Sequence, residues 1–391
     1  MKVSMVDLRP QLEAAEPEIG RHLARLFERM HFILGDEVAS FEREFAAYLG
    51  AANAVGVGSG TAGVELCLRS AGLAHSRREV ITSALTSPFT AQAILAAGGL
   101  PRFADVDPET LLLDPVDAVE RVTRSTGALV PVHLYGQPCD LDRLAALAAR
   151  FEIALIQDAC QAHGARRLGQ PFTCYSPWVA YSFYPTKNLG CLGDGGAVAT
   201  DSEAVAKQIR LLRDGGRDND QVSRLPAINS RLDEMQACYL RAFLPHLDEW
   251  NSRRGRLAGL YDQALADCPE ARPIHHNPGS VNHLYVVRAA DRDRLRAYLL
   301  EHGIATAVHY PEPLHLHPAF RDCGSQAGSL PNAERACREI LSLPLWPYMP
   351  QSAALWVAEN VRAFYGRSRG MRLPSCPADL QGRPVTPDSA P

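Results

Sequence analysis

The sequence predicts an α/β protein in which helices cover a mostly parallel central sheet, with a smaller α+β domain towards the C-terminus. Short apolar runs recur between residues 54 and 200 with helical stretches between them, an alternation typical of parallel strands joined by crossover helices. The 391 residues exceed what one hydrophobic core usually supports, so we expect two domains. Apolar residues form 46% and charged residues 21% of the chain, as in an ordinary globular protein.

Each element is assigned from its local pattern. Periodic stretches between residues 11 and 49 predict helices that are separated near Gly35, and a glycine-rich turn at 56–63 leads from a strand into a helix over 64–71. Apolar runs predict further strands at 80–81, 101–106, 128–134, 153–156, 179–183 and 197–200. Later helices are predicted at 292–301 and 332–341.

The domain boundaries follow from this pattern. We place a large α/β domain, which includes the N-terminal helices, at 1–244 and a small domain at 245–366. Beyond it, five prolines interrupt any periodic pattern, so we expect residues 367–391 to form a flexible tail.

The composition argues against several classes of protein. The net charge is −4 and no basic cluster is interleaved with aromatic residues, which argues against nucleic-acid binding. The chain shows neither a charged-then-apolar leader nor an apolar span of membrane length, so we expect a cytoplasmic protein without a membrane partner. The ten cysteines form no Cys-x-x-Cys pair, a spacing typical of scattered, reduced thiols.

Three histidines close together in the sequence raise the question of a metal site. His309, His315 and His317 could in principle bind a metal, but no His-Glu-x-x-His or similar run is present. Packing within a loop, or contact with a substrate, is the favoured interpretation, and we expect no metal.

Lys187 is the residue that most needs an explanation. Of the three lysines, Lys2 lies at the terminus and Lys207 on an amphipathic helix, whereas Lys187 follows an apolar run and lies in a turn among apolar and glycine residues. Burial lowers the pKa of a lysine, and the neutral amine can then form a Schiff base with a carbonyl, as pyridoxal phosphate enzymes require. The alternative is that a lysine survives there by chance in a chain rich in arginine.

Asp158 carries a second chemical signal, because it ends the apolar run at 153–156. Carboxyl ends of strands are where ligands bind in α/β sheets, and a carboxylate buried there needs a partner. A protonated pyridine nitrogen would serve, and it would keep the ring an electron sink. The alternative is a cap for a helix that begins near Ala159.

The glycine turn at 56–63 predicts an anion site, because unpaired backbone N–H groups and the positive end of a helix dipole converge at such a turn. It is not the dinucleotide fingerprint, since Thr61 stands where the third glycine would fall. A plain structural turn is the alternative.

Together with these features, five stretches resemble the DegT/StrS family of sugar aminotransferases. They arrive in family order within a match that spans about residues 5 to 365, and those around Lys187 and Asn229 are specific. The stretches are GSGT (58–61), DACQAHG (158–164), SFYPTKN (182–188), GDGGA (193–197) and NSRLDEMQA (229–237).

The resemblance implies the aspartate aminotransferase fold (fold type I), pyridoxal 5′-phosphate as cofactor, and a homodimer with active sites at the subunit interface. It also implies that Lys187 is the Schiff-base lysine, that Asp158 binds the pyridine nitrogen and that Gln161 lies near the ring hydroxyl. The groups implied to hold the phosphate are the backbone of Gly60, Thr61 and Ala62, the hydroxyl of Ser182 and, from the neighbouring subunit, Asn229.

One departure from the family concerns the stacking aromatic, whose position is taken by Ser87 here, while Leu85 stands at a position where many relatives have histidine. The nearest aromatic is Phe89, two residues later. Either Phe89 covers the ring after a change in the turn, or it is a plain core residue and stacking is weaker.

For the substrate, the resemblance implies contacts from Tyr184, His309 and Tyr310. The subgroup it favours transfers an amino group from L-glutamate to a nucleotide-linked 3-keto-6-deoxyhexose, with thymidine diphosphate as the expected nucleotide. An aminocyclitol aminotransferase is the main alternative. A sugar dehydratase is disfavoured because such relatives carry histidine at the position of Lys187, and a non-catalytic regulator is disfavoured because Lys187 and Asp158 are both present.

Overall fold

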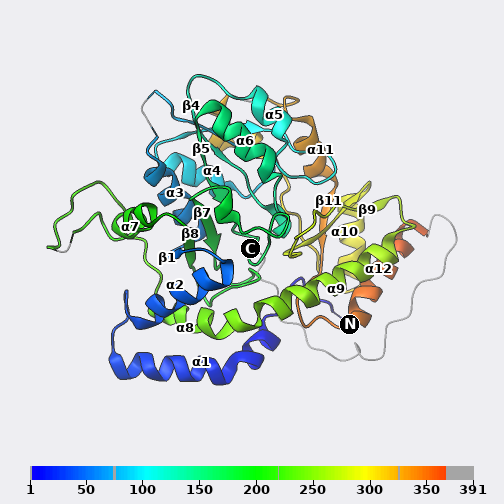
Figure 1. Ribbon diagram of the computed structural model, residues 1–391. Helices are drawn as coiled ribbons and strands as arrows, with labels where there is room; N and C mark the ends of the chain where they lie inside the picture. Colours follow the sequence, from blue (N-terminus) through cyan, green and yellow to red (C-terminus); the bar gives the residue numbers. More distant parts are fainter. Residues whose placement is uncertain (1, 74–75, 219, 325, 367–391) are drawn as a thin grey trace.

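The central sheet consists of two four-stranded ladders that join end to end (Figure 1). The computed structural model describes residues 2–73, 76–218, 220–324 and 326–366. One ladder has the order β1-β8-β7-β6 and the other β3-β2-β4-β5. They meet because one residue separates β5 from β6 and Val132 pairs in parallel with Asp158. The strands are β1 (Asn53–Val57), β2 (Glu79–Ser83), β3 (Leu100–Ala104), β4 (Thr126–Val130), β5 (Ala154–Leu155), β6 (Gln157–Asp158), β7 (Val179–Ser182) and β8 (Gly196–Thr200).

The prediction of a mostly parallel sheet is confirmed, with one exception. β2 pairs in parallel with both β3 and β4, and β6 does so with β7. β8 runs antiparallel to both of its neighbours, β1 and β7. The chain passes from β7 to β8 without a crossover helix, so it returns in the opposite direction. This connection contains Lys187.

The helices cover both faces of this sheet, and the glycine turn leads into α3 as predicted. Ser59 caps α3 through its side chain, so the helix begins at Gly60, four residues earlier than the periodic pattern indicated. At the bottom of Figure 1, α1 and α2 pack with α8 beneath the sheet. These helices are α1 (Arg9–Arg29), α2 (Asp36–Leu49), α3 (Gly60–Ala71), α4 (Pro88–Ala96), α5 (Pro115–Glu120), α6 (Leu141–Phe151), α7 (Glu203–Leu212) and α8 (Glu234–Phe243).

The C-terminal part contains a small antiparallel sheet with the order β11-β10-β9. The predicted helix at 292–301 is present as α10, but the helix predicted at 332–341 ends at Glu339, because Ile340 begins a buried strand. The elements of this part are α9 (Leu247–Leu265), β9 (Ala271–Pro273), β10 (Tyr285–Ala289), α10 (Arg292–Glu301), α11 (Pro331–Glu339), β11 (Ile340–Leu343) and α12 (Gln351–Gly366).

Helix α9 joins the two parts of the molecule. Its first half packs Leu247 and Trp250 into the large core, while Leu257 and Tyr261 belong to the core around the small sheet. The N-terminal Val3 also packs into the small core. The boundary predicted at residue 244 falls just before α9 and stays a prediction, and the predicted tail at 367–391 lies outside the described residues.

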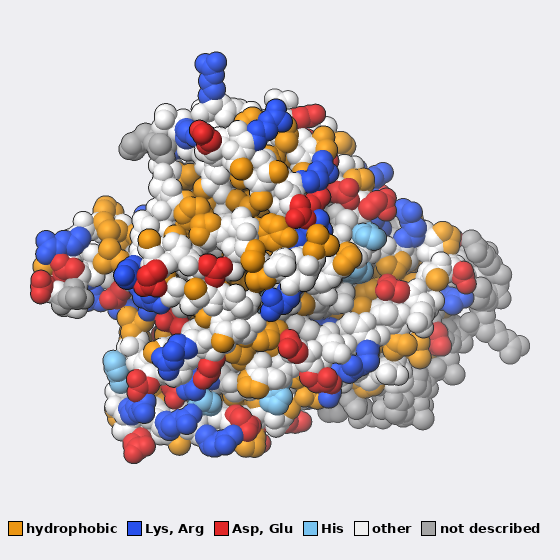
Figure 2. All heavy atoms as spheres, in the orientation of Figure 1, with side chains coloured by type: hydrophobic (Ala, Val, Ile, Leu, Met, Phe, Trp, Pro, Cys, Tyr) orange, Lys and Arg blue, Asp and Glu red, His pale blue; other side chains and the backbone are white. Residues whose placement is uncertain are grey.

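The surface carries mixed charge, and Figure 2 shows acidic and basic side chains interspersed over this face of the molecule. Within the described part of the chain, no helix combines the length and the apolar character needed to cross a bilayer.

Candidate active site

The carboxyl ends of β6 and β7 carry the two residues for which the sequence predicted chemistry. Asp158 is the last residue of β6, and Lys187 lies in the turn that follows β7. The Lys187 amide N–H donates to the carbonyl of Tyr184 at 2.9 Å. The turn is tight, since a Cβ atom added at Gly190 would lie 2.4 Å from the carbonyl oxygen of Pro185. The lysine is therefore held by a turn that depends on glycine.

Lys187 is partly buried, and loss of hydration lowers the pKa of its amine. The neighbouring Cys160 thiol and Asp158 carboxylate oppose this shift by favouring the charged form. The net effect is a lowered pKa, so more of the amine is neutral near pH 7 than in an exposed lysine.

The Asp158 carboxylate is 5% exposed and is held by two donors. Its Oδ2 accepts a hydrogen bond from the Thr90 hydroxyl at 2.8 Å, and its Oδ1 accepts one from the Cys160 amide at 3.1 Å. No helix begins at Ala159, so the interpretation of Asp158 as a helix cap is wrong. The two donors fix the orientation of the carboxylate and leave lone pairs for a further partner.

The first turn of α3 lies against the strand ends. A Cβ atom at Gly60 would come within 2.6 Å of both Cys160 Sγ and Ser182 Cβ, so only glycine fits. The Ala62 amide already donates to the Ser59 hydroxyl at 3.1 Å, whereas the amides of Gly60 and Thr61 meet no acceptor within the described part of the chain. Of the three predicted backbone donors, these two are the ones open to a ligand.

A hollow of about 480 Å³ opens beside this turn. Asn229 lines this hollow together with Ser59 and Ala62 of the same chain, and its expected contact with the phosphate of the neighbouring subunit stays a prediction. The lining residues are Ile33, Gly58, Ser59, Ala62, Asp194, Ile228, Asn229, Ser230, Arg231 and Asp233. The hollow is large enough for a ligand group or for a segment of a second chain.

The segment at 229–237 also braces the site. Ser230 accepts a hydrogen bond from the Gly58 amide at 3.0 Å, and the Gln236 side chain accepts one from Leu192 at 3.0 Å. The buried Glu234 carboxylate accepts from the amides of Gly35, Glu37 and Val38 and so caps α2. Part of this motif therefore has a structural role.

Gln161 and Tyr310 lie together across the site. The Gln161 side chain accepts a hydrogen bond from the Tyr135 amide at 2.7 Å and donates to the Tyr310 hydroxyl at 3.4 Å. His309 precedes Tyr310, and its Nδ1 lies 2.8 Å from the Ser342 hydroxyl. Tyr184, the third predicted substrate residue, is 40% exposed beside the lysine turn.

Phe89 is 62% exposed in the first turn of α4, so its interpretation as a core residue is wrong. Next to it, Ser87 lies close enough to the Tyr310 hydroxyl to stabilise its ionised form, although burial is the larger effect and raises the pKa of Tyr310 to about 12. Tyr310, from the C-terminal part of the chain, thus approaches the position where relatives carry an aromatic residue.

The other histidines have structural surroundings. His133 is buried, stacks on Phe172 with ring centres 4.1 Å apart, and has a pKa lowered to about 4 by burial. His315 pairs with Glu334, and His317 lies near the carbonyl of Glu312. Among the residues that the structure describes, no three His, Cys, Asp or Glu side chains group as metal ligands.

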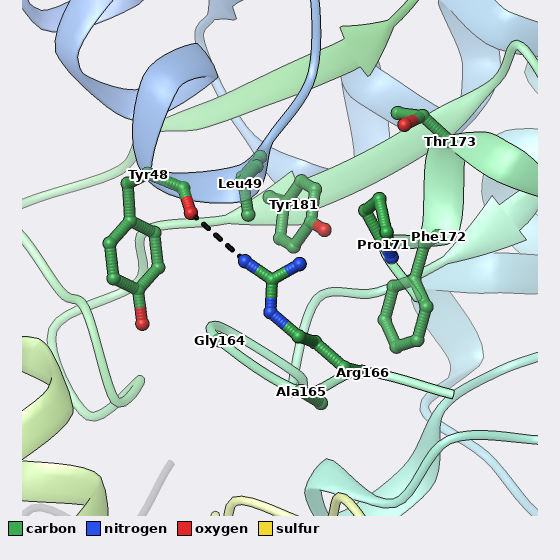
Figure 3. Close-up of a pocket in the computed structure, with 9 residues that line it drawn as sticks. All are labelled: Tyr48, Leu49, Gly164, Ala165, Arg166, Pro171, Phe172, Thr173 and Tyr181. Carbon is green, nitrogen blue, oxygen red and sulfur yellow. Dashed lines mark hydrogen bonds between the residues drawn. The ribbon is translucent and has the colours of Figure 1, made fainter. Parts of the chain in front are cut away.

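A second pocket, shown in Figure 3, is too small for a substrate. Its volume is about 10 Å³, roughly the space of one water molecule. Arg166 projects into it and donates to the carbonyl of Tyr48 at 3.4 Å, near the C-terminus of α2. This pocket belongs to the packing of α2 against the loop after β6.

Sequence reasoning missed the residues that hold the predicted ones in place. The Thr90 hydroxyl donates a hydrogen bond to Asp158. Asn188, which follows Lys187 in the sequence, has its side-chain oxygen 3.0 Å from Nδ1 of His283. Asn188 adjoins Lys187 in the sequence and could have been singled out. Thr90 and His283 carry no local signal, because only the fold brings them to the site.

A mostly parallel α/β sheet, a desolvated lysine and a buried carboxylate at neighbouring strand ends, and a helix N-terminus beside them define the class of fold type I pyridoxal phosphate enzymes. The family model of the DegT/DnrJ/EryC1/StrS aminotransferases matches residues 14–362, and the chain belongs to this family. It is a pyridoxal phosphate-dependent sugar aminotransferase.

Two relatives and one solved structure place the chain within the family. It is 41% identical to a dTDP-3-amino-3,4,6-trideoxy-alpha-D-glucose transaminase of Streptomyces venezuelae, over 94% of this chain and 97% of that one. It is also 41% identical to a pleiotropic regulatory protein of Geobacillus stearothermophilus, over 93% and 99%. The crystal structure of S. venezuelae DesV in complex with a ketimine intermediate superimposes with a TM-score of 0.89 at 41% identity, covering 93% and 98%.

Proposed function

We propose that this enzyme transfers the amino group of L-glutamate to the keto carbon of a dTDP-linked 3-keto-6-deoxyhexose. The observation that carries the proposal is that the desolvated Lys187 amine lies within electrostatic range of the Asp158 carboxylate, at strand ends against which the first turn of α3 packs. Similarity to a dTDP-3-amino-sugar transaminase over nearly the whole chain supports the choice of substrate.

The residues present fit pyridoxal phosphate. The amides of Gly60 and Thr61 are open at the N-terminus of α3, next to the hollow that Ser59 and Ala62 line, and a helix N-terminus is a natural phosphate site. Gly60, Thr61, Ser182 and Asn229 would hold the phosphate, with Ala62 contributing if Ser59 releases its amide. Gln161 would lie against the ring hydroxyl.

When bound, pyridoxal phosphate supplies an aldehyde and an electron-withdrawing ring that makes a neighbouring C–H bond acidic. Asp158 would bind the protonated ring nitrogen, and the hydrogen bond from Thr90 fixes the orientation of its carboxylate. The Lys187 amine would bind the aldehyde and afterwards take and return the proton at the carbon that bears the transferred amino group. Glutamate leaves as 2-oxoglutarate, and the keto sugar leaves as the amino sugar.

Tyr184, His309 and Tyr310 are proposed to contact the sugar nucleotide. Burial lowers the pKa of His309 to about 4, so its imidazole is neutral at pH 7 and can exchange hydrogen bonds with a hydroxyl or keto oxygen. Tyr184 is exposed at the same edge of the site, where a large substrate can reach it.

We also propose that the enzyme is a cytoplasmic homodimer with shared active sites. Large apolar side chains are exposed at the end of α1 and directly after it, and one of them, Ile33, lines the hollow with Asn229. Exposed apolar side chains of this kind are typical of an interface. Here they are Phe27, Met30, Phe32 and Ile33. The nine described cysteines are all unpaired, which supports a reducing compartment.

A regulatory role is the second candidate, because one 41% identical relative is named a pleiotropic regulatory protein. An aminocyclitol substrate is a further alternative. An assay distinguishes these two alternatives from the proposed reaction. The enzyme is given L-glutamate and either dTDP-3-keto-6-deoxyglucose or a keto-inositol, and the amino product is detected by mass spectrometry. We expect kcat/KM to be roughly 100-fold higher for the sugar nucleotide. Preference for keto-inositol would assign the aminocyclitol reaction, and cofactor-loaded protein that transfers no amino group would favour the regulator.

The role of Lys187 is tested by Lys187→Ala. We expect the variant to lose the long-wavelength absorbance of the bound cofactor and at least about 100-fold of the turnover rate. Lys207→Ala is the matched control, because Lys207 lies exposed on α7 near Glu203. Retention of both absorbance and turnover in Lys187→Ala would contradict the assignment.

A further inference from the structure

The side chain that follows the lysine in sequence has every hydrogen-bonding group in use. Asn188 is 1% exposed, and its Nδ2 donates to Asn251 Oδ1 at 2.8 Å and to the carbonyl of Val281 at 3.0 Å. Its Oδ1 lies 3.0 Å from Nδ1 of His283. Because the Val281 carbonyl can only accept, the amide orientation is fixed, and the His283 Nδ1 must carry a proton.

His283 is itself held firmly. Its amide donates to the carbonyl of Tyr135 at 2.9 Å, and its carbonyl accepts from the buried Arg254 guanidinium at 3.2 Å. The residue is 6% exposed. With both backbone groups bound, the imidazole has a defined position from which to hold Asn188.

The same network reaches the loop that follows Asp158. Asn251, on α9, uses its Nδ2 to donate to the carbonyl of His163 at 2.9 Å. His163 belongs to the turn that follows β6 and contains Gln161. One chain of hydrogen bonds from His283 through Asn188 and Asn251 therefore connects the lysine turn to the loop after Asp158.

We propose that His283 is a positioning residue for Lys187, acting through Asn188 and Asn251 to set the lysine amine relative to Asp158. Loss of the His283 donor would leave the buried Asn188 Oδ1 without a partner and loosen the turn that keeps the amine away from water. The proposal rests on the proposed catalytic role of Lys187, but not on the identity of the sugar.

The charge state of His283 agrees with this geometry. Burial lowers its pKa, and the facing cations and imidazoles lower it further. These neighbours are Lys187, Arg254, His163 and His309. The imidazole therefore stays neutral, with its proton on Nδ1, throughout the range around pH 7.

Two substitutions of His283 distinguish the role of Nδ1 from that of Nε2. His283→Asn places an amide N–H near the position of Nδ1 and keeps the donor to Asn188, whereas His283→Gln places its amide near Nε2 and loses that donor. His275→Gln is the matched control, since His275 is exposed and takes no part in the network. Asn251→Ala breaks the network at its other end.

The readout is the reactivity of Lys187 itself. The full-length enzyme, loaded with pyridoxamine phosphate so that the lysine amine is free, is labelled with trace acetic anhydride across a range of pH. Peptide mass spectrometry then follows each lysine, and the chain has three, so Lys2 and Lys207 serve as internal references.

We expect His283→Gln and Asn251→Ala to raise the labelling midpoint of Lys187 by about one pH unit, because water reaches the amine. Both should lower kcat roughly tenfold, the effect of one lost hydrogen bond, with KM for the sugar nucleotide within about twofold. His283→Asn should restore most of kcat and the low midpoint.

Three results would overturn the proposal. A loss in His283→Asn that is spared in His283→Gln would assign the role to Nε2 instead. An equal loss of kcat in His283→Asn and His283→Gln, without a shift of the Lys187 labelling midpoint, would show that His283 has a merely structural role. An unchanged midpoint and an unchanged kcat in His283→Gln and Asn251→Ala would show that the network does not position Lys187. The labelling of Lys187 measures its exposure to water and does not depend on turnover. The catalytic role of Lys187 is tested separately by Lys187→Ala, so failure of one proposal can be told from failure of the other.

Discussion

The Lys187 amine lies among groups that are mostly uncharged near neutral pH. Burial lowers the pKa of His163 to about 3 and that of His309 to about 4, and both imidazoles are further disfavoured as cations by the lysine. Asp158 and Cys160 act in the other direction on the amine. The amine is thus held where its neutral form is accessible while a fixed carboxylate remains within electrostatic range.

At the scale of single residues, the sequence predicts which residues follow the strands, but it does not predict which other residues hydrogen-bond to them. Lys187 and Asp158 follow apolar runs, so their places at the sheet edge can be predicted from local pattern. Thr90 lies in α4, 68 residues before Asp158, and contacts it only because the fold brings the start of α4 to the end of β6. No spacing rule encodes such a contact.

The hydrogen bond from Thr90 to Asp158 gives a prediction for one residue. Thr90→Val removes the hydroxyl but keeps the shape, and one oxygen of a buried carboxylate loses its donor. We expect kcat to fall roughly tenfold and cofactor affinity to weaken, since a hydrogen bond to a charged group contributes about 1.5–3 kcal/mol. Steady-state kinetics and cofactor titration measure both effects, and Thr90→Ser should recover most of the loss. Wild-type kcat in Thr90→Val would show that Asp158 does not need this support.

At the scale of elements, the first turn of α3 is the part of the site that the sequence describes best. The strand, the glycine turn and the helix N-terminus predict an anion site without any knowledge of the rest of the chain. The need for glycine at residue 60 could not be predicted, because it arises from Cys160 in the loop after β6 and from Ser182 at the end of β7. The same limit explains β8, whose direction depends on a connection without helical periodicity.

A pair of glycine substitutions tests the close approach of α3. In Gly60→Ala the new methyl group would meet Cys160 and Ser182 at 2.6 Å, so α3 must move away from the strand ends. We expect the dissociation constant of the cofactor to rise at least about tenfold, because the open amides shift with the helix. Equilibrium titration with pyridoxal phosphate measures the change.

Gly20→Ala is the control for that substitution. Gly20 lies within α1, and a Cβ atom there would meet nothing within 4 Å. We expect cofactor binding as in the wild type and a gain in the free energy of unfolding of about 0.5–1 kcal/mol from helix propensity. Unchanged cofactor affinity in Gly60→Ala would contradict the placement of the phosphate at α3.

At the scale of the whole molecule, the candidate active site adjoins an open hollow that Asn229 lines. A loop between α7 and α8 extends away from the body at the left of Figure 1. Residues 228–231 and 233, just before α8, line the hollow. A single chain brings Asn229 near its own α3, whereas the family resemblance implies that Asn229 serves the partner's site. The sequence predicts the motif but cannot decide between these two arrangements.

Mixed dimers decide between them. Lys187→Ala and Asn229→Ala are each expected to be nearly inactive. If Asn229 acts across the interface, a mixed dimer contains one intact site, and co-refolding the two variants in equal amounts should restore about a quarter of wild-type activity. If Asn229 acts within its own chain, both sites of the mixed dimer stay defective and no activity returns. We expect restoration.

The central claim is that Lys187 binds the cofactor covalently, and reduction of the holoenzyme with borohydride tests it most directly. Reduction fixes the phosphopyridoxyl group on the amine that carries it, and peptide mass spectrometry has three lysines to distinguish. We predict the label on Lys187 alone, and its loss in Lys187→Ala. A label on Lys2 or Lys207, or cofactor that is released without any covalent adduct, would contradict the account.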